Sequence, residues 1–281
     1  MTPTLPRFRA HPGPLPAAPD ARWFAFRGND LFVRVLPEGG PHAYEVPVAA
    51  DASALPASPV RTQPLGWIDG IPCHSAELPE DAPEREGHAY VSLRRLYGRA
   101  DAAVFEAAGT AFQVQYWDRT HQFCSVCATP LTLAEGERSK RCPRCAHQFF
   151  PKVTPATIVL IEDGPRILMT RAPRFPPGMY GLVAGFVESG ESLEACVARE
   201  VAEETGVSIT DITYFGSQPW PFPHQVMVGF VARYAGGEIV VNKDELEEAA
   251  WFHKDALPNL PPALSIARQL VDAWLSRHAK P

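Results

Sequence analysis

The chain has 281 residues, enough for about two domains at roughly 150 residues each, with a sizeable buried core. Hydrophobic residues make up 46% and charged residues 21%, which excludes a disordered tail, a coiled coil and a collagen-like repeat. With 26 Lys and Arg against 32 Asp and Glu, the net charge of −6 excludes a global basic field for nucleic acid. Neither a membrane-spanning apolar run nor a signal-peptide pattern is visible, so we expect a cytoplasmic protein without membrane association.

The first 119 residues predict a small β-rich domain that ends in a helix. Residues 1–20 are rich in Pro and Ala, and we expect them to be disordered. Short, turn-bounded runs of strand character follow at Trp23–Phe26, Leu31–Val35 and Gly66–Ile68. Apolar residues spaced by threes and fours then predict a helix over 100–119. The expected domain limits are 21–119 for this part, 120–152 for a cysteine-rich segment and 153–281 for the rest.

Four of the six cysteines form two CxxC pairs, in the order C-x2-C-x14-C-x2-C: Cys124, Cys127, Cys142 and Cys145. Each pair can wrap a tight turn around one ion, and four thiolates complete a tetrahedral zinc shell with no open position. This pattern predicts one structural zinc per chain, with redox or incidental cysteines as the alternative. Over 138–152 the segment has no acid and five basic residues, which form either a phosphate site or an ordinary solvated face: Arg138, Lys140, Arg141, Arg144 and Lys152.

After Pro151 the pattern becomes that of a strand-rich α/β domain. Two strands over 157–161 and 166–170 are joined by a tight turn at Asp163-Gly164. Alternating apolar residues predict another strand over 226–234. An amphipathic helix is expected over 263–278, with its apolar residues on one face.

The most informative stretch, residues 185–207, reads G-x5-E-x7-R-E-U-x-E-E-x-G-U, where U is a bulky apolar residue. Ser192 is a good N-cap and Gly206 a good C-terminal cap, so the stretch predicts a helix over 193–205. Three of its glutamates stand at i, i+3 and i+4 and share one patch, where like charges repel: Glu200, Glu203 and Glu204.

A solvated acidic face is the usual explanation for such a helix. Here the patch borders the apolar stripe and has only Arg199 nearby as a counter-charge. Mg²⁺ or Mn²⁺ bound through carboxylate oxygens would relieve the repulsion. A metal held in this way can neutralise a diphosphate and orient an attacking water, which predicts hydrolysis of a phosphoanhydride.

The motif is the Nudix box, and the chain resembles the Nudix hydrolase family. The resemblance implies that the catalytic residues are Glu200, Glu203 and Glu204. It implies a Mg²⁺ or Mn²⁺ shell made by the Ala184 carbonyl, Glu200, Glu204 and Glu245, the last within an acidic run that leaves its register open by a few positions. It also implies structural roles within the box for Gly185, Glu191, Arg199 and Gly206.

Starting 11 residues after Gly206, the chain reads Ser-Gln-Pro-Trp-Pro-Phe-Pro over 217–223. Alternating prolines and aromatics predict a stiff, extended segment with two aromatic faces, and a rigid surface loop is the alternative. Together with the cysteine segment and the Nudix box, it resembles the signature of the NADH pyrophosphatase subfamily, over about residues 90–278. The resemblance implies that the substrate is bound by Arg95, Phe150, Phe186, Gln218, Pro219, Trp220, Pro221, Phe222, Pro223, His224 and Ala267.

Two positions depart from the pattern of this subfamily. Phe149-Phe150 replaces a common Tyr pair, so a ring remains but a hydroxyl hydrogen bond is lost. His224-Gln225 stands where the signature commonly continues into a Ser, which leaves the contacts at that end of the pocket open.

The expected fold is α/β (α+β): a Nudix α/β/α sandwich with a mixed sheet, preceded by a zinc ribbon and a small β-rich N-terminal domain. The expected reaction is metal-dependent hydrolysis of the diphosphate of NADH or NAD⁺ to nicotinamide mononucleotide and AMP. The resemblance also implies a homodimer and activity on RNA that carries NAD at its 5′ end. The alternatives are a broad dinucleotide or ADP-ribose pyrophosphatase and, in a different class, a zinc-ribbon binding module with an inactive Nudix domain.

Overall fold

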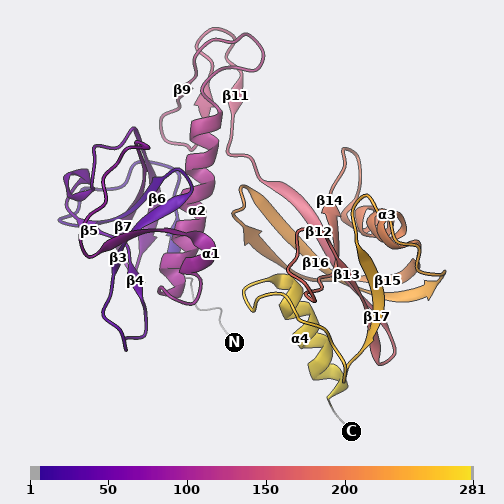
Figure 1. Ribbon diagram of the computed structural model, residues 1–281. Helices are drawn as coiled ribbons and strands as arrows, with labels where there is room; N and C mark the ends of the chain where they lie inside the picture. Colours follow the sequence, from indigo (N-terminus) through magenta and orange to yellow (C-terminus); the bar gives the residue numbers. More distant parts are fainter. Residues whose placement is uncertain (1–6, 280–281) are drawn as a thin grey trace. The chain divides into compact units, whose positions relative to one another are not determined.

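The structure is a computed structural model that describes residues 7–279 (Figure 1). It divides into two compact units, each described here by itself. The N-terminal unit comprises the described residues up to Lys152 together with Pro221–His224, and the C-terminal unit comprises Val153–Trp220 and the described residues from Gln225 onward.

The N-terminal unit is built on a sheet of eight strands in the order β1-β6-β7-β2-β3-β4, with β5 on β2 and β8 on β3. Only β2 and β7 run parallel; the other pairs are antiparallel. The strands are Phe8–Ala10 (β1), Ala21–Arg27 (β2), Asp30–Val35 (β3), Tyr44–Glu45 (β4), Val48–Ala49 (β5), Arg61–Ile68 (β6), Ile71–Leu78 (β7) and His88–Ser92 (β8). The three strands expected from the sequence are therefore present.

The expectation of disorder over residues 1–20 is wrong for β1. Phe8 is 8% exposed and joins the core of the sheet, and β1 pairs with β6 along its whole length. A three-residue strand with one buried side chain has no local signal within a Pro-rich stretch, because its partner lies about 60 residues further along the chain. Residues 1–6 lie outside the described residues.

Helix α2 (Ala102–Thr120) packs on this sheet and gives the unit its core. Asp101 begins the helix by accepting a hydrogen bond from the Ala103 amide at 3.0 Å. Its small residues let the helix approach the strands closely, and all of these are buried: Ala103, Ala107, Ala108 and Ala111. Two shorter helices precede it, the 3₁₀ turn η1 (Ala52–Ala54) and α1 (Leu93–Leu96).

A small three-stranded antiparallel sheet follows α2 in the cysteine-rich segment. Its strands are β9 (Thr132–Leu133), β10 (Lys140–Arg141) and β11 (Gln148–Phe149), in the order β11-β10-β9. Lys140 of β10 is buried and forms an ion pair with Asp118 of α2 at 2.5 Å. The ribbon is thus joined to the end of α2 by a buried charge pair.

The C-terminal unit has a mixed sheet in the order β15-β16-β12-β13-β17, with β14 on β12. Strands β12 and β16 run parallel and the other pairs antiparallel. The strands are Thr154–Asp163 (β12), Arg166–Arg171 (β13), Val183–Phe186 (β14), Ser208–Trp220 (β15), Gln225–Gly236 (β16) and Glu248–His253 (β17).

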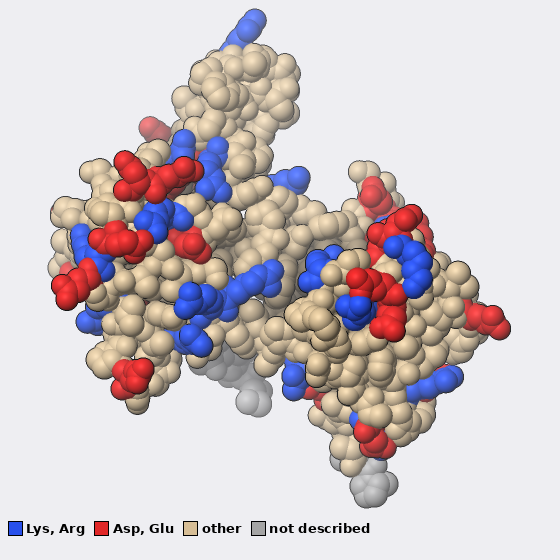
Figure 2. Space-filling model, in the orientation of Figure 1, with Lys and Arg blue, Asp and Glu red and all other residues tan. Residues whose placement is uncertain are grey.

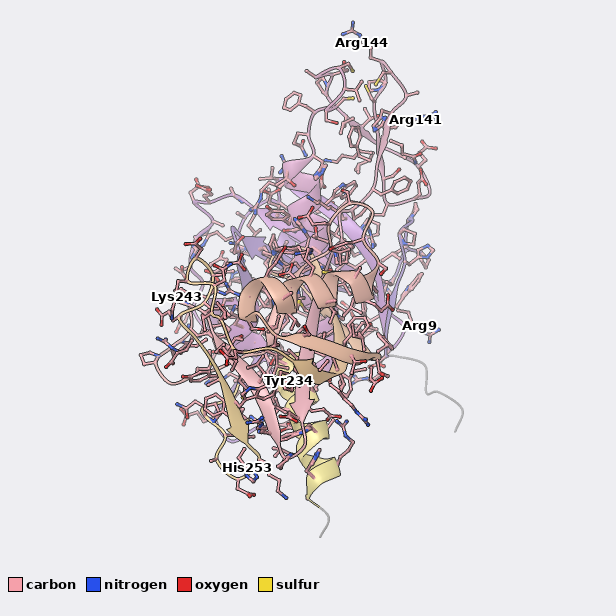
Figure 3. All side chains as sticks on the ribbon, turned by 90° about the vertical axis from the view of Figure 1, so that its right-hand side faces the viewer. Arg9, Arg141, Arg144, Tyr234, Lys243 and His253 are labelled. Carbon is pink, nitrogen blue, oxygen red and sulfur yellow. The ribbon has the colours of Figure 1, made fainter. Side chains whose placement is uncertain are left out.

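Two helices cover opposite faces of this sheet, because successive side chains of a strand point to opposite sides. Ile158 and Leu160 of β12 pack with α4 (Ile266–His278) around the fully buried Trp274. Val159 and Ile161 pack instead with α3 (Leu193–Thr205). The result is the expected α/β/α sandwich, in which α3 lies across one face of the sheet (Figure 3).

Two local expectations are corrected. Helix α4 begins at Ile266 instead of residue 263, because Ser265 caps it by accepting a hydrogen bond from the Arg268 amide. The proline-rich segment is extended only as far as Trp220, the end of β15. Pro221–His224 then forms the turn that leads into β16, so the segment is a hairpin tip and not one extended wall.

Candidate active site and metal centres

The four cysteines of the ribbon come together as a metal site. Their Sγ atoms lie within 4.8 Å of one another, and three Sγ–Sγ distances fall between 3.4 and 3.7 Å. A zinc ion with Zn–S bonds of about 2.3 Å would give Sγ–Sγ edges of about 3.8 Å, whereas a disulfide would need about 2.05 Å. The geometry therefore fits zinc, and all six cysteines are free of disulfides.

The two CxxC turns repeat one backbone design. Ala128 and Ala146, which follow the second cysteine of each pair, have φ values of 58° and 61°. Their amides donate to the carbonyls of Cys124 and Cys142 at 2.8 and 3.0 Å. Each turn thereby directs two thiols toward one point, as a four-thiolate shell requires.

The structure divides the basic residues of the stretch 138–152 into internal and external ones. Arg138 donates to the carbonyls of His11 and Pro64 at 2.7 Å, and burial lowers its pKa. Lys140 is the buried partner of Asp118. Only Arg141, Arg144 and Lys152 are exposed, and Figure 3 shows the first two on the outside of the ribbon. The stretch is therefore not one continuous phosphate-binding face.

The Nudix-box helix has the predicted limits and caps. Ser192 accepts from the Ala195 amide at 3.1 Å, and Gly206 ends α3 in the left-handed conformation with φ 73°. Gly185, on β14, stands directly against the carboxylate of Glu200: a Cβ atom there would lie 1.8 Å from the Glu200 Cδ atom. Glycine at this position is what lets the buried carboxylate pass beside the strand.

Arg199 holds the loop and the helix together, as the resemblance implies. Its guanidinium donates to both oxygens of Glu191 at 2.5 and 2.9 Å and to the Phe186 carbonyl at 3.0 Å. It also donates to Glu200 at 2.8 Å and to Glu203 at 2.9 Å. The bonds from Arg199 lower the pKa of Glu191 to about 2, so this brace stays ionised.

Three carboxylates converge beside this brace: oxygens of Glu200, Glu204 and Glu245 lie within 4.8 Å of one another. Glu200 and Glu204 are 8% and 6% exposed. Burial, followed by the charges of Glu200 and Glu245, raises the pKa of Glu204 to about 8. Burial also raises the pKa of Glu200. Three crowded carboxylates, of which Glu200 and Glu204 are buried, are the donor set that a hard divalent cation prefers.

Glu245 lies in the loop before β17, outside the helix, and its backbone amide donates to the Asn242 carbonyl at 3.2 Å. Of the acidic residues in its run, it is the one found in the cluster. The group does not include Glu203, whose side chain is 56% exposed and accepts a hydrogen bond from Arg199. Ala184 lies on β14 opposite Ile158, next to the glycine that admits Glu200.

A buried polar contact beneath the site was not expected from the sequence. Cys196 of α3 is fully buried, and its thiol donates to the Phe186 carbonyl at 3.3 Å. Thr157 of β12 lies 3.3 Å from the same sulfur. The carbonyl of Phe186 is thus held by both Arg199 and Cys196, while its ring is 48% exposed. The sequence offers no signal for the contact between Thr157 and Cys196, because these residues are 39 positions apart.

The predicted substrate residues are distributed over both units. The C-terminal unit contains Phe186, Gln218, Pro219, Trp220 and Ala267, and the N-terminal unit contains Arg95, Phe150, Pro221, Phe222, Pro223 and His224. Phe150 is 58% exposed, whereas Ala267 is only 7% exposed and lies in the core under α4. Gln218 donates to the Leu264 carbonyl at 2.7 Å and accepts from the Ile266 amide at 2.8 Å, so its amide joins β15 to the start of α4.

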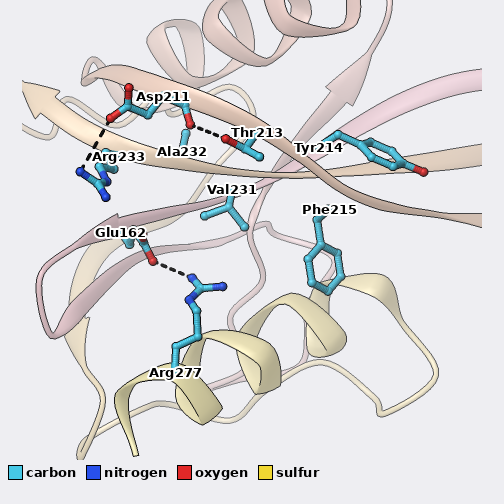
Figure 4. A pocket seen from close by; sticks show the side chains of 9 residues that line it. All are labelled: Glu162, Asp211, Thr213, Tyr214, Phe215, Val231, Ala232, Arg233 and Arg277. Carbon is cyan, nitrogen blue, oxygen red and sulfur yellow. Dashed lines mark hydrogen bonds and ion pairs between the residues drawn. The ribbon is translucent and has the colours of Figure 1, made fainter. Parts of the chain in front are cut away.

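The C-terminal unit also contains a hollow of about 400 Å³ beyond these residues (Figure 4). Phe215 and Val231 line it together with two ion pairs, Arg277–Glu162 at 2.8 Å and Arg233–Asp211 at 3.8 Å. None of the clustered glutamates lines it. Because its charges are already paired within the chain, we assign the chemistry to the carboxylate cluster and not to this hollow.

An α/β/α sandwich whose capped helix carries Glu200 and Glu204 against a glycine-bearing strand, with Glu245 added from a loop, defines a Nudix hydrolase. Three family models match the chain in sequence: an NADH pyrophosphatase-like rudimentary NUDIX domain at residues 20–117, an NADH pyrophosphatase zinc ribbon domain at 119–150 and a NUDIX domain at 152–274. The chain belongs to the NADH pyrophosphatase family of Nudix hydrolases.

Similar proteins include the NAD-capped RNA hydrolase NudC of Deinococcus radiodurans, 41% identical over 269 residues that cover 93% of this chain and 90% of that protein. The NAD-capped RNA hydrolase NudC of Stutzerimonas stutzeri is 47% identical over 217 residues, 76% of this chain and 78% of that protein. Among solved structures, a NUDIX hydrolase from Nitrosomonas europaea aligns with a TM-score of 0.49 and 23% identity over 57% of this chain and 94% of that chain.

Proposed function

We propose that this hydrolase cleaves the diphosphate of NADH or NAD⁺ to nicotinamide mononucleotide and AMP, and that it removes NAD from the 5′ end of RNA. The observation that carries the proposal is the cluster of Glu200, Glu204 and Glu245, together with the exposed aromatic ring of Phe186, the residue after Gly185. The names of the relatives support the choice of substrate, since they describe NAD-capped RNA hydrolases.

In this proposal Glu200, Glu204 and Glu245, with the carbonyl of Ala184, hold Mg²⁺ or Mn²⁺. A divalent cation held there would neutralise the diphosphate and favour ionisation of the attacking water. Water adds to one phosphorus, the bridging P–O bond breaks, and two monophosphates leave. Glu203 is exposed and held at 2.9 Å by Arg199, which suits it to accept the proton of the water.

The other residues of the site position these groups. Gly185 admits the Glu200 carboxylate, Arg199 and Glu191 brace the loop to α3, and Gly206 ends the helix. The ring of Phe186 offers a face on which a base or the nicotinamide can stack. We place Arg95, Phe150, Gln218, Pro219, Trp220, Pro221, Phe222, Pro223, His224 and Ala267 among the substrate-binding residues, with Gln218 acting through its bonds to the start of α4.

The zinc of the ribbon is structural in this proposal, one ion per chain, because four thiolates leave no position for substrate. We further propose that the protein is a cytoplasmic homodimer. Its proposed domains are residues 21–119, 120–152 and 153–281, and the first domain is extended toward the N-terminus to include β1. None of the helices within residues 7–279 is long and apolar enough to cross a membrane. Light scattering on the purified protein tests the dimer, and elemental analysis tests the zinc.

The experiment that tests the reaction compares kcat/KM for NADH, NAD⁺, ADP-ribose and an NAD-capped RNA on one preparation. We expect the substrates that contain nicotinamide to be preferred over ADP-ribose, with nicotinamide mononucleotide as the product. Equal turnover of ADP-ribose would favour a broad dinucleotide pyrophosphatase. The absence of hydrolysis of all four with saturating Mg²⁺ and Mn²⁺ would favour a binding module.

A further inference from the structure

Three arginines and one tyrosine lie together on and just after α1; we call Arg94, Arg95, Tyr97 and Arg99 the α1 basic patch. All four are exposed, and Tyr97 keeps 40% of its surface. Figure 2 shows Lys and Arg side chains gathered over the region where Figure 1 places α1. The chain has no acidic residue over 87–100. The patch therefore has a strong local positive charge on a protein whose net charge is −6.

The nearest acid in sequence does not neutralise this patch. Asp101 accepts from the Ala103 amide at 3.0 Å and pairs with Arg7 at 2.7 Å. The guanidinium groups of Arg95 and Arg99 have no ion pair within residues 7–279. Two arginine heads are thus available for an external anion.

The aromatic side chain of the patch is held in a fixed orientation. The ring of Tyr97 meets that of Phe105 edge-on, with centroids 5.4 Å apart, and this contact leaves much of the Tyr97 ring exposed. Leu93 and Leu96, its apolar neighbours on α1, are both buried. A lipid surface would be expected to meet exposed aliphatic side chains, but this patch offers a single ring between positive charges.

The patch adjoins one end of the proposed substrate-binding segment within the same unit. The Arg94 guanidinium lies 4.1 Å from the centroid of the Phe222 ring, and Phe222 belongs to the hairpin tip Pro221–His224. A strand that extends from a substrate held at this tip would meet Arg94 first. The remaining residues of the patch follow within five positions of Arg94.

We propose that the α1 basic patch binds the RNA that follows an NAD cap, as a single strand. The guanidinium group of Arg99 binds a phosphate of this strand, and the ring of Tyr97 stacks on an unpaired base, whereas Arg95 keeps its proposed contact to the NAD portion. The proposal rests on the proposed function for its substrate class. It gives the chain a contact to the RNA body that NADH, with two nucleosides and one diphosphate, does not use.

The test measures binding of a labelled, uncapped, single-stranded oligoribonucleotide about 10 nucleotides long, within the ~4–16 nucleotides that one site covers. Fluorescence anisotropy is followed in a salt series for the wild type, Tyr97→Ala and Arg99→Gln. Arg144→Gln is the matched control, because Arg144 is an exposed arginine of the ribbon (Figure 3). Vesicles of anionic phospholipid are the second probe.

We expect Tyr97→Ala to weaken RNA binding about fivefold or more, the lower end of what loss of base stacking costs. Arg99→Gln should lower the slope of log K against log salt by about 0.7, the value for one lost phosphate contact on a single strand. Tyr97→Phe should bind like the wild type, since it keeps the ring. Arg144→Gln should have no effect.

Steady-state kinetics separates RNA binding from a merely structural role. For NAD-capped RNA we expect Tyr97→Ala and Arg99→Gln to raise KM with kcat unchanged, and for NADH neither value should move. Unchanged RNA affinity in both variants, or weakening by Arg144→Gln alone, would overturn the proposal. Equal losses on NADH with a lower melting temperature would do so as well, by assigning the patch to packing.

Two further outcomes keep this proposal distinct from the proposed function. If the wild type binds RNA through the patch but hydrolyses no dinucleotide, the proposed reaction fails and the RNA site stands. If it hydrolyses NADH but binds the vesicles more tightly than RNA, the reaction stands and the RNA site fails.

Discussion

Both units of this protein bury carboxylates, but Asp118 of the N-terminal unit has an ion-pair partner among the described residues and Glu204 of the C-terminal unit has none. In the N-terminal unit, Asp118 pairs with Lys140 at 2.5 Å and accepts from Gln63 at 2.8 Å. In the C-terminal unit, Glu204 is equally buried but makes no ion pair within residues 7–279. A buried charge is tolerated when it is paired, so the first acid is structural and the second requires an external cation.

The helices that carry these acids show the same division of labour. Helix α2 uses alanines to approach its sheet, and the domain to which it belongs matches a rudimentary NUDIX domain. Helix α3 places buried carboxylates beside buried valines, Val197 and Val201. The residues of α2 therefore serve mainly to pack against the sheet. In α3, burial and mutual repulsion of the carboxylates cost stability, and the same carboxylates can bind a metal ion.

The largest expected effect is a loss of stability on removal of the buried positive charge of Lys140. Lys140→Met should lower the free energy of unfolding by about 3–5 kcal/mol, because Asp118 is left buried without its partner. Urea titration followed by circular dichroism measures it. The double variant with Asp118→Asn removes both charges and should recover much of the loss. A single variant within about 1 kcal/mol of the wild type would show that Asp118 is hydrated or otherwise paired.

The second effect is a loss of activity on substitution of Glu204, the buried acid without an ion-pair partner among the described residues. Glu204→Gln should reduce kcat/KM for NADH about 100-fold or more, because a neutral amide is a poor ligand for a hard cation. Without metal its melting temperature should stay equal or rise, since one source of repulsion is removed. Glu194→Gln, on the exposed side of the same helix, is the matched control. Near-normal turnover of Glu204→Gln in saturating Mg²⁺ would refute the metal site.

Local signals allowed α3 to be predicted to the residue, since its limits depend on Ser192 and Gly206 alone. Non-local pairing explains the failures. The sequence groups Lys140 with the other basic residues of 138–152, because its partner Asp118 lies 22 residues earlier and is brought to it only by the fold. Likewise, Glu245 could be found only to within a few positions, because a loop in an acidic run has no period that fixes which side chain faces α3.

The third prediction concerns the binding of a divalent cation to the carboxylate cluster that contains Glu204. Titration with Mg²⁺ should raise the melting temperature of the wild type, because binding to the folded state alone adds about 2.7 kcal/mol at 100 times Kd. EDTA should reverse the shift, and Glu204→Gln should show little of it. Lys140→Met should keep the full Mg²⁺ shift despite its lower stability. An equal shift in Glu204→Gln would place the cation elsewhere.

The smallest effect concerns the exposed ring of Phe186. The backbone of Phe186 is fixed by Arg199 and Cys196, yet its side chain is 48% exposed and outside the cores of the unit. Burial in the core would make Phe186→Ala cost about 3–5 kcal/mol of stability, but an exposed ring contributes far less. Loss of base stacking, in contrast, is worth ~1–3 kcal/mol, or roughly 5- to 150-fold in kcat/KM.

Phe186→Ala should therefore lower kcat/KM for NADH by roughly 5- to 150-fold at nearly unchanged melting temperature, and lower that for ADP-ribose less. The control variant Tyr214→Ala removes a ring of the same unit that is 59% exposed and lines the hollow of Figure 4. It should change kcat/KM for neither substrate. Losses that are equal on both substrates would show that the ring supports the loop and does not select the nicotinamide. In that case the exposed face of Phe186 would belong to the braced framework that positions Glu200, and specificity would lie with the hairpin tip.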